Sequence, residues 1–85
     1  MPHVYEIHDG GESYWWAADS AEAAEKLHRD YMMSCGVRED ETSVDGTIEW
    51  PDEKTLRMDD ATKTCAEWAA ETVKCKVPMV GTTAI

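Results

Sequence analysis

The sequence predicts an α+β fold: a small two-layer domain in which a mostly antiparallel sheet packs against two helices. Three observations predict it. Two alternating segments meet at an Asp-Gly-Gly turn near the start of the chain, helix signals follow at two places, and Pro78 leaves the last residues extended. With 85 residues and a hydrophobic share of 42%, we expect a single domain, residues 1–85, with a small core.

The first predicted element is a hairpin of two strands, residues 4–8 and 12–18, joined by a turn at Asp9-Gly10-Gly11. Asp-Gly and Gly-Gly both suit two-residue turns that need positive φ. Either loop pairs odd residues of the first strand with even residues of the second, so one face carries Tyr5, Ile7, Tyr14 and Trp16. A single layer cannot bury both neighbouring tryptophans. Trp15, on the other face, either packs under a loop or tail or is an exposed aromatic anchor for a partner.

A helix is predicted directly after the hairpin. Asp19 with Glu22 forms an Asp version of the capping box, and Ser20 is an alternative N-cap. Gly36 supplies the C-terminal stop. Helical spacing gives an expected buried stripe of Ala24, Leu27, Tyr31 and Cys35.

The second half predicts two short strands, a second helix and a last strand. Residues 47–50 alternate as a strand does, and Pro51 ends that strand or places it at an edge. Residues 54–58 alternate in the same way. The second helix begins at Asp60 or at Thr64, and residues 77–85 form an extended tail or an edge strand. The expected buried stripe of the second helix is Cys65, Trp68, Ala69 and Thr72.

These apolar stripes also predict where the helices pack. Trp68 of the second helix, together with Leu27 and Tyr31 of the first, is expected to lie on the face of the sheet that carries Trp16. Both helices would then cover the same face. The other face would remain partly in contact with water.

Charge is the feature most informative about function. The chain has 18 Asp and Glu against 8 Lys and Arg, a net charge of −10. Six carboxylates precede the first basic residue, Lys26, and a second acidic block has no basic residue between Arg38 and Lys54. Such a field repels nucleic acid and membrane surfaces and attracts basic proteins. The expected partner is therefore a basic protein surface, and the expected binding residues are Glu39, Asp40, Glu41, Asp45, Glu49, Asp52 and Glu53, with Glu12 and Trp15.

Residues capable of chemistry form no recognisable set. The spacing of Cys35, Cys65 and Cys75 matches no disulfide scaffold or zinc pattern, so we expect reduced thiols in a cytosolic protein. A cysteine nucleophile would need a histidine partner, and no local signature supports one. The three histidines, His3, His8 and His28, lack metal-ligand spacing. We expect no catalytic site, metal or cofactor, and we find no signal peptide or transmembrane run.

Two segments carry a resemblance. DGGESYWWAADSAEAAEKLH, residues 9–28, and TKTCAEWAAE, residues 62–71, resemble small acidic proteins of phages and prophages, in which a tryptophan-containing hairpin precedes an acidic-capped helix. Such proteins include anti-CRISPR inhibitors, several of which resemble DNA in charge and occupy the basic surfaces where a CRISPR effector complex holds its target. The resemblance implies a non-enzymatic inhibitor that acts in the host bacterial cytosol.

The sequence is also compatible with two other functions. One is an interaction or structural module of a phage or mobile element, acting through exposed Trp15 and a sheet edge. The other is a small enzyme or ligand-binding domain. The partner's identity, the oligomeric state and the strand order are not predicted.

Overall fold

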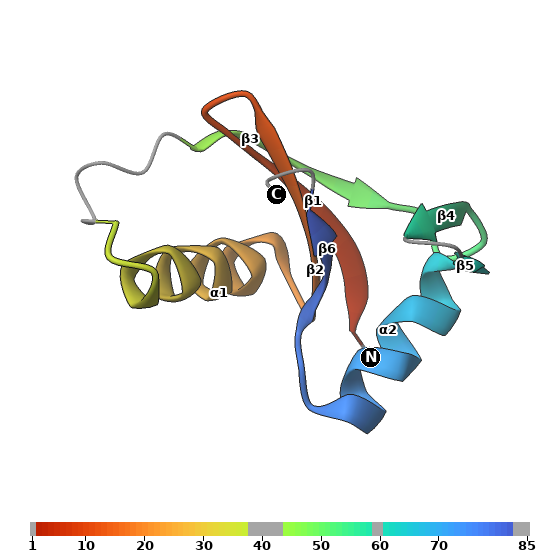
Figure 1. Cartoon of the computed structure of the whole chain (residues 1–85). Coiled ribbons are helices and arrows are strands. Elements are labelled where there is room, and N and C mark those ends of the chain that lie inside the picture. The colour runs from red at the N-terminus through yellow and green to blue at the C-terminus, as the bar shows by residue number, and fades with distance from the viewer. Residues whose placement is uncertain (1, 38–43, 59–60, 83–85) are drawn as a thin grey trace.

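The structure is a computed structural model that describes residues 2–37, 44–58 and 61–82. These residues form six strands and two helices, and the α+β class predicted from the sequence is confirmed (Figure 1). The strands are β1 (His3–Asp9), β2 (Glu12–Ala18), β3 (Val44–Trp50), β4 (Thr55–Met58), β5 (Ala61–Thr64) and β6 (Met79–Thr82), and the helices are α1 (Ala21–Ser34) and α2 (Cys65–Cys75).

Four of the strands form an antiparallel sheet in the order β3-β1-β2-β6, and β4 pairs with β5 in a separate two-stranded sheet. Strand β3 is at one edge of the larger sheet, and β6 is at the other edge, where it pairs with β2. Both edge positions agree with the sequence analysis. None of the described helices is long and apolar enough to cross a membrane.

The hairpin has the predicted register. Gly10 and Gly11 form the two-residue turn with φ values of 58° and 89°, a region that glycine enters without steric cost. Tyr5 therefore lies opposite Trp16, and Ile7 lies opposite Tyr14. All four side chains are buried in one core cluster, as the parity of the strands predicts.

Helix α1 begins after Ser20, whose hydroxyl accepts a hydrogen bond from the Ala23 amide at 3.1 Å. The alternative N-cap of the sequence analysis is thus the one observed. The expected buried stripe is partly wrong, because Ala24 and His28 are the buried residues of the helix. Small Ala24 lets the helix approach the sheet, and His28 finds an acceptor there. Of the other expected stripe residues, Leu27 is half-buried, and Tyr31 and Cys35 are exposed.

Helix α2 begins after Thr64, one of the two predicted starts. The Glu67 amide donates to the Thr64 hydroxyl at 3.2 Å, and the Thr64 amide donates to the Glu67 carboxylate at 3.1 Å. These two bonds complete the predicted capping box. Cys65 and Ala69 are buried, as expected. The residues just before the helix form β5, a strand that the sequence analysis did not predict.

The two helices cover opposite faces of the four-stranded sheet, as Figure 1 shows. Helix α1 packs on the face of Ile7 and Trp16. Helix α2 packs on the other face, where Val4 and Ala17 are buried and Trp68 lies beside them. The expectation that both helices share one face is therefore wrong. Side chains of a strand alternate between its two faces, and both faces of β1 and β2 carry apolar side chains. Each face therefore needs its own cover.

Candidate functional site

Exposed carboxylates line strand β3. As an edge strand, β3 leaves one side of its backbone unpaired by β1. Asp45 and Glu49 lie on this strand, and Asp52 and Glu53 follow it in the next turn; all four are exposed. Together with two carboxylates near the start of α1, these residues form a surface that we call the acidic edge. Its members are Asp19, Glu25, Asp45, Glu49, Asp52 and Glu53.

Helix α1 brings the first acidic segment of the sequence to β3. Thr47 on β3 donates from its hydroxyl to Oε2 of Glu25, at 2.9 Å. Two residues further along the strand, Glu49 accepts from the Tyr5 hydroxyl at 3.1 Å. Thr47 and Glu49 share one face because side chains of a strand alternate. Two acidic segments separated by about twenty residues thus meet on one rigid surface.

The electrostatics of the acidic edge are visible at Tyr5. Burial raises the pKa of its phenol, and the hydrogen bond to Glu49 raises that pKa further. The negative charges of Glu49, Asp19 and Asp52 add to the effect. Several carboxylates therefore act on a single group at this end of the sheet. A negative potential of this kind favours the approach of cations.

Two lysine ion pairs lie away from this surface. On α1, Lys26 Nζ is 3.1 Å from a carboxylate oxygen of Asp30. On the α2 side, Lys63 Nζ is 3.9 Å from Glu71. Both pairs use exposed or half-exposed side chains, and pairs of this kind contribute little to stability. Neither pair neutralises a carboxylate of the acidic edge.

The end of the acidic edge near Asp52 has two basic neighbours. His3 Nδ1 is 2.9 Å from Asp52 Oδ1. Lys54 Nζ lies over the ring of Trp50, 5.2 Å from its centroid, and this geometry gives a cation–π contact. We therefore expect the negative potential to be strongest toward Glu49 and Asp45.

The structure places the eight acidic residues of the predicted binding set in three groups. It brings Asp45, Glu49, Asp52 and Glu53 together on the acidic edge. Glu12 is half-buried at the start of β2, and β1 separates it from β3, so Glu12 is not part of that surface. The remaining three, Glu39, Asp40 and Glu41, lie outside the described residues.

Trp15 packs against the second core cluster, beneath α2. It is half-buried, and its ring meets that of Trp50 edge-on, with 6.5 Å between the ring centroids. Its indole Nε1 is buried and makes no hydrogen bond within the described part of the chain. Of the two alternatives for Trp15, the structure shows packing, with α2 as the cover in place of a loop or tail. Trp15 is therefore not an exposed anchor.

Sequence reasoning missed one buried polar pair. His28 Nε2 lies 2.7 Å from Asp9 Oδ2, and both side chains are buried. The ring of Tyr14 covers the imidazole at a centroid distance of 4.6 Å. Its sequence signal is weak: His28 follows Ala24 by one helical turn, and Asp9 flanks the hairpin turn. Because both groups are buried, the pair ties α1 to the hairpin and does not meet a substrate from solvent.

Burial disfavours reactivity at one of the three cysteines. Cys35, Cys65 and Cys75 are free thiols. Burial raises the pKa of Cys65, which lowers the fraction of reactive thiolate at neutral pH. Within the described ranges, no three His, Cys, Asp or Glu side chains are arranged to hold a metal ion. The acidic edge is therefore the best supported candidate site.

No family model matches the chain, and no curated protein and no solved structure matches it either.

Proposed function

We propose that this protein is a non-enzymatic inhibitor that binds a basic, nucleic-acid-binding surface of another protein through its acidic edge. The observation that carries this proposal is the meeting of two acidic segments at β3, held by the Thr47–Glu25 and Tyr5–Glu49 hydrogen bonds. Carboxylates fixed on a rigid surface compete with phosphates for Lys and Arg. The partner's nucleic acid is then displaced without any chemical step.

The class of partner rests on the resemblance of residues 9–28 and 62–71 to small phage and prophage proteins. It favours a complex of the host's defence, in particular a CRISPR effector complex in the bacterial cytosol. The alternative, an interaction module that uses an exposed aromatic at the sheet edge, has less support. Trp15 is packed beneath α2, so this module would lack its anchor.

This mode of binding has a characteristic salt dependence. Exposed charges are screened over about 10 Å at 0.1 M salt. An inhibitor that acts through carboxylates should lose affinity steeply as salt is added, mainly through slower association. An interface built on aromatic side chains should respond much less. Salt titration therefore distinguishes the inhibitor from the aromatic module.

A pair of charge-reversal variants tests the surface itself. Asp45→Lys/Glu53→Lys changes two exposed carboxylates of the acidic edge. Asp30→Lys/Glu71→Lys changes two exposed carboxylates elsewhere, whose ion pairs with Lys26 and Lys63 contribute little to stability. Each reversal adds two charges, so both variants go from a net charge of −10 to −6. The measurement is release of fluorescent target DNA from a panel of purified CRISPR effector complexes.

We expect the wild-type protein and the Asp30/Glu71 variant to release DNA equally well. The Asp45/Glu53 variant should be weaker by about two orders of magnitude, because attractive contacts become repulsive. Equal release by both variants would mean that net charge alone acts. Failure of the wild-type protein to release DNA from any complex would remove the defence complex as the partner.

A further inference from the structure

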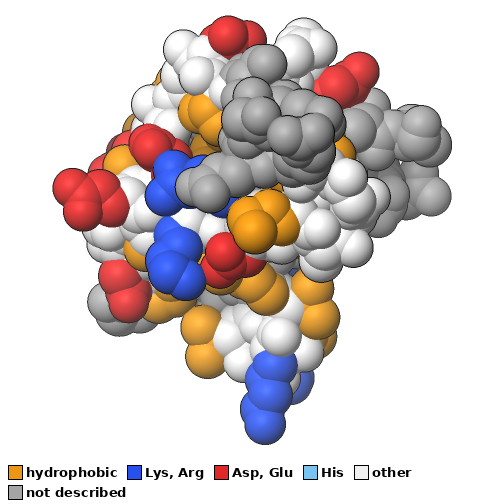
Figure 2. Space-filling model, turned by 90° about the vertical axis from the view of Figure 1, so that its left-hand side faces the viewer, with side chains coloured by type: hydrophobic (Ala, Val, Ile, Leu, Met, Phe, Trp, Pro, Cys, Tyr) orange, Lys and Arg blue, Asp and Glu red, His pale blue; other side chains and the backbone are white. Residues whose placement is uncertain are grey.

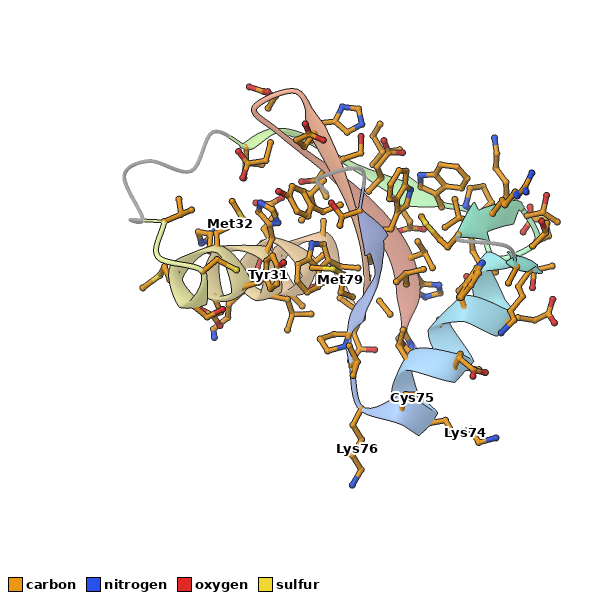
Figure 3. The ribbon with its side chains drawn as sticks, in the orientation of Figure 1. Tyr31, Met32, Lys74, Cys75, Lys76 and Met79 are labelled. Carbon is orange, nitrogen blue, oxygen red and sulfur yellow. The ribbon has the colours of Figure 1, made fainter. Side chains whose placement is uncertain are left out.

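A second surface lies on the side of α1 that faces away from the Thr47–Glu25 hydrogen bond. Two pockets of about 430 and 290 Å³ meet at Leu27 and form one groove between α1 and the chain that links α2 to β6. One wall is formed by Ala23, Leu27 and Tyr31 of α1. The other wall is formed by Val73, Val77 and Met79. We call these six residues the apolar groove; Figure 3 shows Tyr31 and Met79 on its two walls.

The apolar groove is unusually exposed for its composition. Val73 is 62% exposed, Val77 is 55% exposed and Tyr31 is 37% exposed. Seen from the α1 side, hydrophobic side chains lie between the charged upper part of the molecule and the basic tip at the bottom (Figure 2). Contiguous exposed apolar side chains framed by polar ones mark an interaction site.

The backbone beside the groove favours a helical ligand over an extended one. The Val77 amide already donates to the Thr72 carbonyl at 3.3 Å, and the Pro78 carbonyl accepts from the Ala17 amide at 2.8 Å. Pro78 has no N–H to offer. A strand added here would therefore lack backbone partners at these positions, and the ligand must bind through side chains.

The shape of the groove also suits a helix. Ala23, Leu27 and Tyr31 follow each other at intervals of four residues, so they form a straight stripe along α1. Eight residues of helix span about 12 Å, which corresponds to two turns of a ligand helix lying alongside. Ala23 is small and leaves room at one end.

The charges around the groove differ from those of the rest of the molecule. Lys26 lines one pocket, and Asp19 lies at the same end. At the other end, Lys76 directly precedes Val77, and Lys74 lies on the same tip (Figure 3). Three of the chain's five lysines thus lie at or beside the groove, where Lys26 also pairs with Asp30 at 3.1 Å. They favour a ligand with carboxylates beside its apolar face, and they oppose a second copy packed groove to groove.

We propose that the apolar groove docks an amphipathic helix of a partner protein, with apolar residues at positions i, i+4 and i+8 and with carboxylates along their flanks. The apolar residues fill the two pockets that meet at Leu27. The carboxylates reach Lys26 and Lys76. The protein then has two binding surfaces of opposite character: the acidic edge for a basic surface, and the groove for an acidic helix.

The test uses synthetic peptides and the isotope-labelled protein. The probe is an acetylated helical peptide of about 18 residues, or five turns, with Leu on one face and Glu on the flanks. A second peptide carries Lys at each Glu position. Amide chemical shifts are followed during titration near physiological salt. We expect the Glu peptide to perturb the amides of Leu27, Tyr31 and Val77, although the protein is acidic overall.

Two variants with equal changes in charge locate the binding. Val73→Asp/Val77→Asp places charge in the groove and should weaken binding of the Glu peptide about tenfold or more. Val44→Asp/Ile48→Asp alters two exposed apolar residues on β3 and should bind like the wild-type protein. Circular dichroism verifies that both variants are folded.

Three results would overturn the proposal: no binding of the Glu peptide, equal loss in both variants, or a dimer in sedimentation that Val73→Asp/Val77→Asp dissociates. The dimer would assign the groove to a second copy. The Lys peptide reports on the other surface, because it should perturb β3 amides if the acidic edge binds cations. Failure of the groove and failure of the acidic edge are thereby measured separately.

Discussion

The two faces of the four-stranded sheet are covered in different ways. Under α1, Tyr14 and Trp16 are buried together with a polar pair, Asp9 and His28, that is itself buried. Under α2, a core of aliphatic residues and Cys65 is surrounded by half-buried indoles. These indoles belong to Trp15, Trp50 and Trp68. A helix lies over each face, but only under α2 do three indole rings surround the buried residues, and we call these rings the indole rim.

This difference shows two solutions to burying polar atoms. On the face under α1, His28 Nε2 pairs with Asp9 inside the core, whereas Trp16 Nε1 and His28 Nδ1 are buried without a hydrogen-bond partner among the described residues. On the face under α2, Trp50 Nε1 donates to Glu6 Oε1 at 2.9 Å, and Trp68 Nε1 donates to the Leu56 carbonyl at 2.7 Å. The rim side chains keep some contact with water. Truncation should therefore be more destabilising under α1 than under α2.

The neighbouring tryptophans give the most direct test, because they point to opposite faces. Trp16 is 3% exposed, and Trp16→Ala should lower the free energy of unfolding by about 3–5 kcal/mol. Small domains are stable by roughly 5–15 kcal/mol, so a large part of this variant should be unfolded. Trp15 is only half-buried, so Trp15→Ala should lower the free energy of unfolding by less, about 2 kcal/mol.

Urea denaturation followed by circular dichroism measures both values. The slope of the transition should be similar for the two variants if only the native state changes. Equal losses would contradict the comparison and show that the face under α2 is packed as tightly as the face under α1.

The buried polar pair should have the next largest effect. Asp9→Ala leaves the buried imidazole of His28 without this acceptor, and we expect a loss of about 3 kcal/mol. The double variant Asp9→Ala/His28→Leu replaces the whole pair by apolar groups. It should be more stable than Asp9→Ala alone, since a buried pair replaced as a unit is often nearly neutral.

The same denaturation measurements, arranged as a double-mutant cycle with His28→Leu, give the coupling energy of the pair. Losses that simply add would show that Asp9 and His28 act independently. In that case, the polar pair would not be what distinguishes the face under α1.

How far the sequence predicts this fold depends on the range of the interactions. The hairpin register follows from two glycines in the turn, and the start of α2 follows from Thr64 and Glu67, three residues apart. Both are local signals. The face on which each helix packs depends on the whole chain, and neither helix carries a local mark of it. The adjacent tryptophans point to opposite faces, but the sequence left Trp15 open between packing and exposure, and the second face was expected to stay partly in contact with water.

The candidate site also depends partly on a local sequence signal and partly on long-range packing. The acidic block between Arg38 and Lys54 is visible in the sequence, and its described carboxylates lie along an edge strand and in the turn after it. Its union with Glu25 depends on α1 lying across β3, which no pattern within either segment reveals. His28 likewise lies outside the buried stripe that helical spacing predicts for α1. A rotation of α1 by part of a turn, set by tertiary packing, decides that His28 is buried and Tyr31 is exposed.

The smallest of the expected effects concerns Glu6, on the face under α2. Burial by itself would raise the pKa of Glu6, but hydrogen bonds from His8 and Trp50 outweigh it and hold the pKa below the ordinary value of 4.5. A carboxylate with a lowered folded-state pKa stabilises the protein above its unfolded-state pKa, and this contribution is lost as the pH falls through the folded-state value.

Glu6→Gln keeps an acceptor for Trp50 and should cost about 1 kcal/mol at pH 7. Its melting temperature should then fall less between pH 7 and pH 3 than that of the wild-type protein. Glu71→Gln, at an exposed position on α2, is the control and should follow the wild-type curve. If all three curves fall in parallel, the indole rim does not depend on ionised Glu6, and the contrast between the two faces reduces to packing alone.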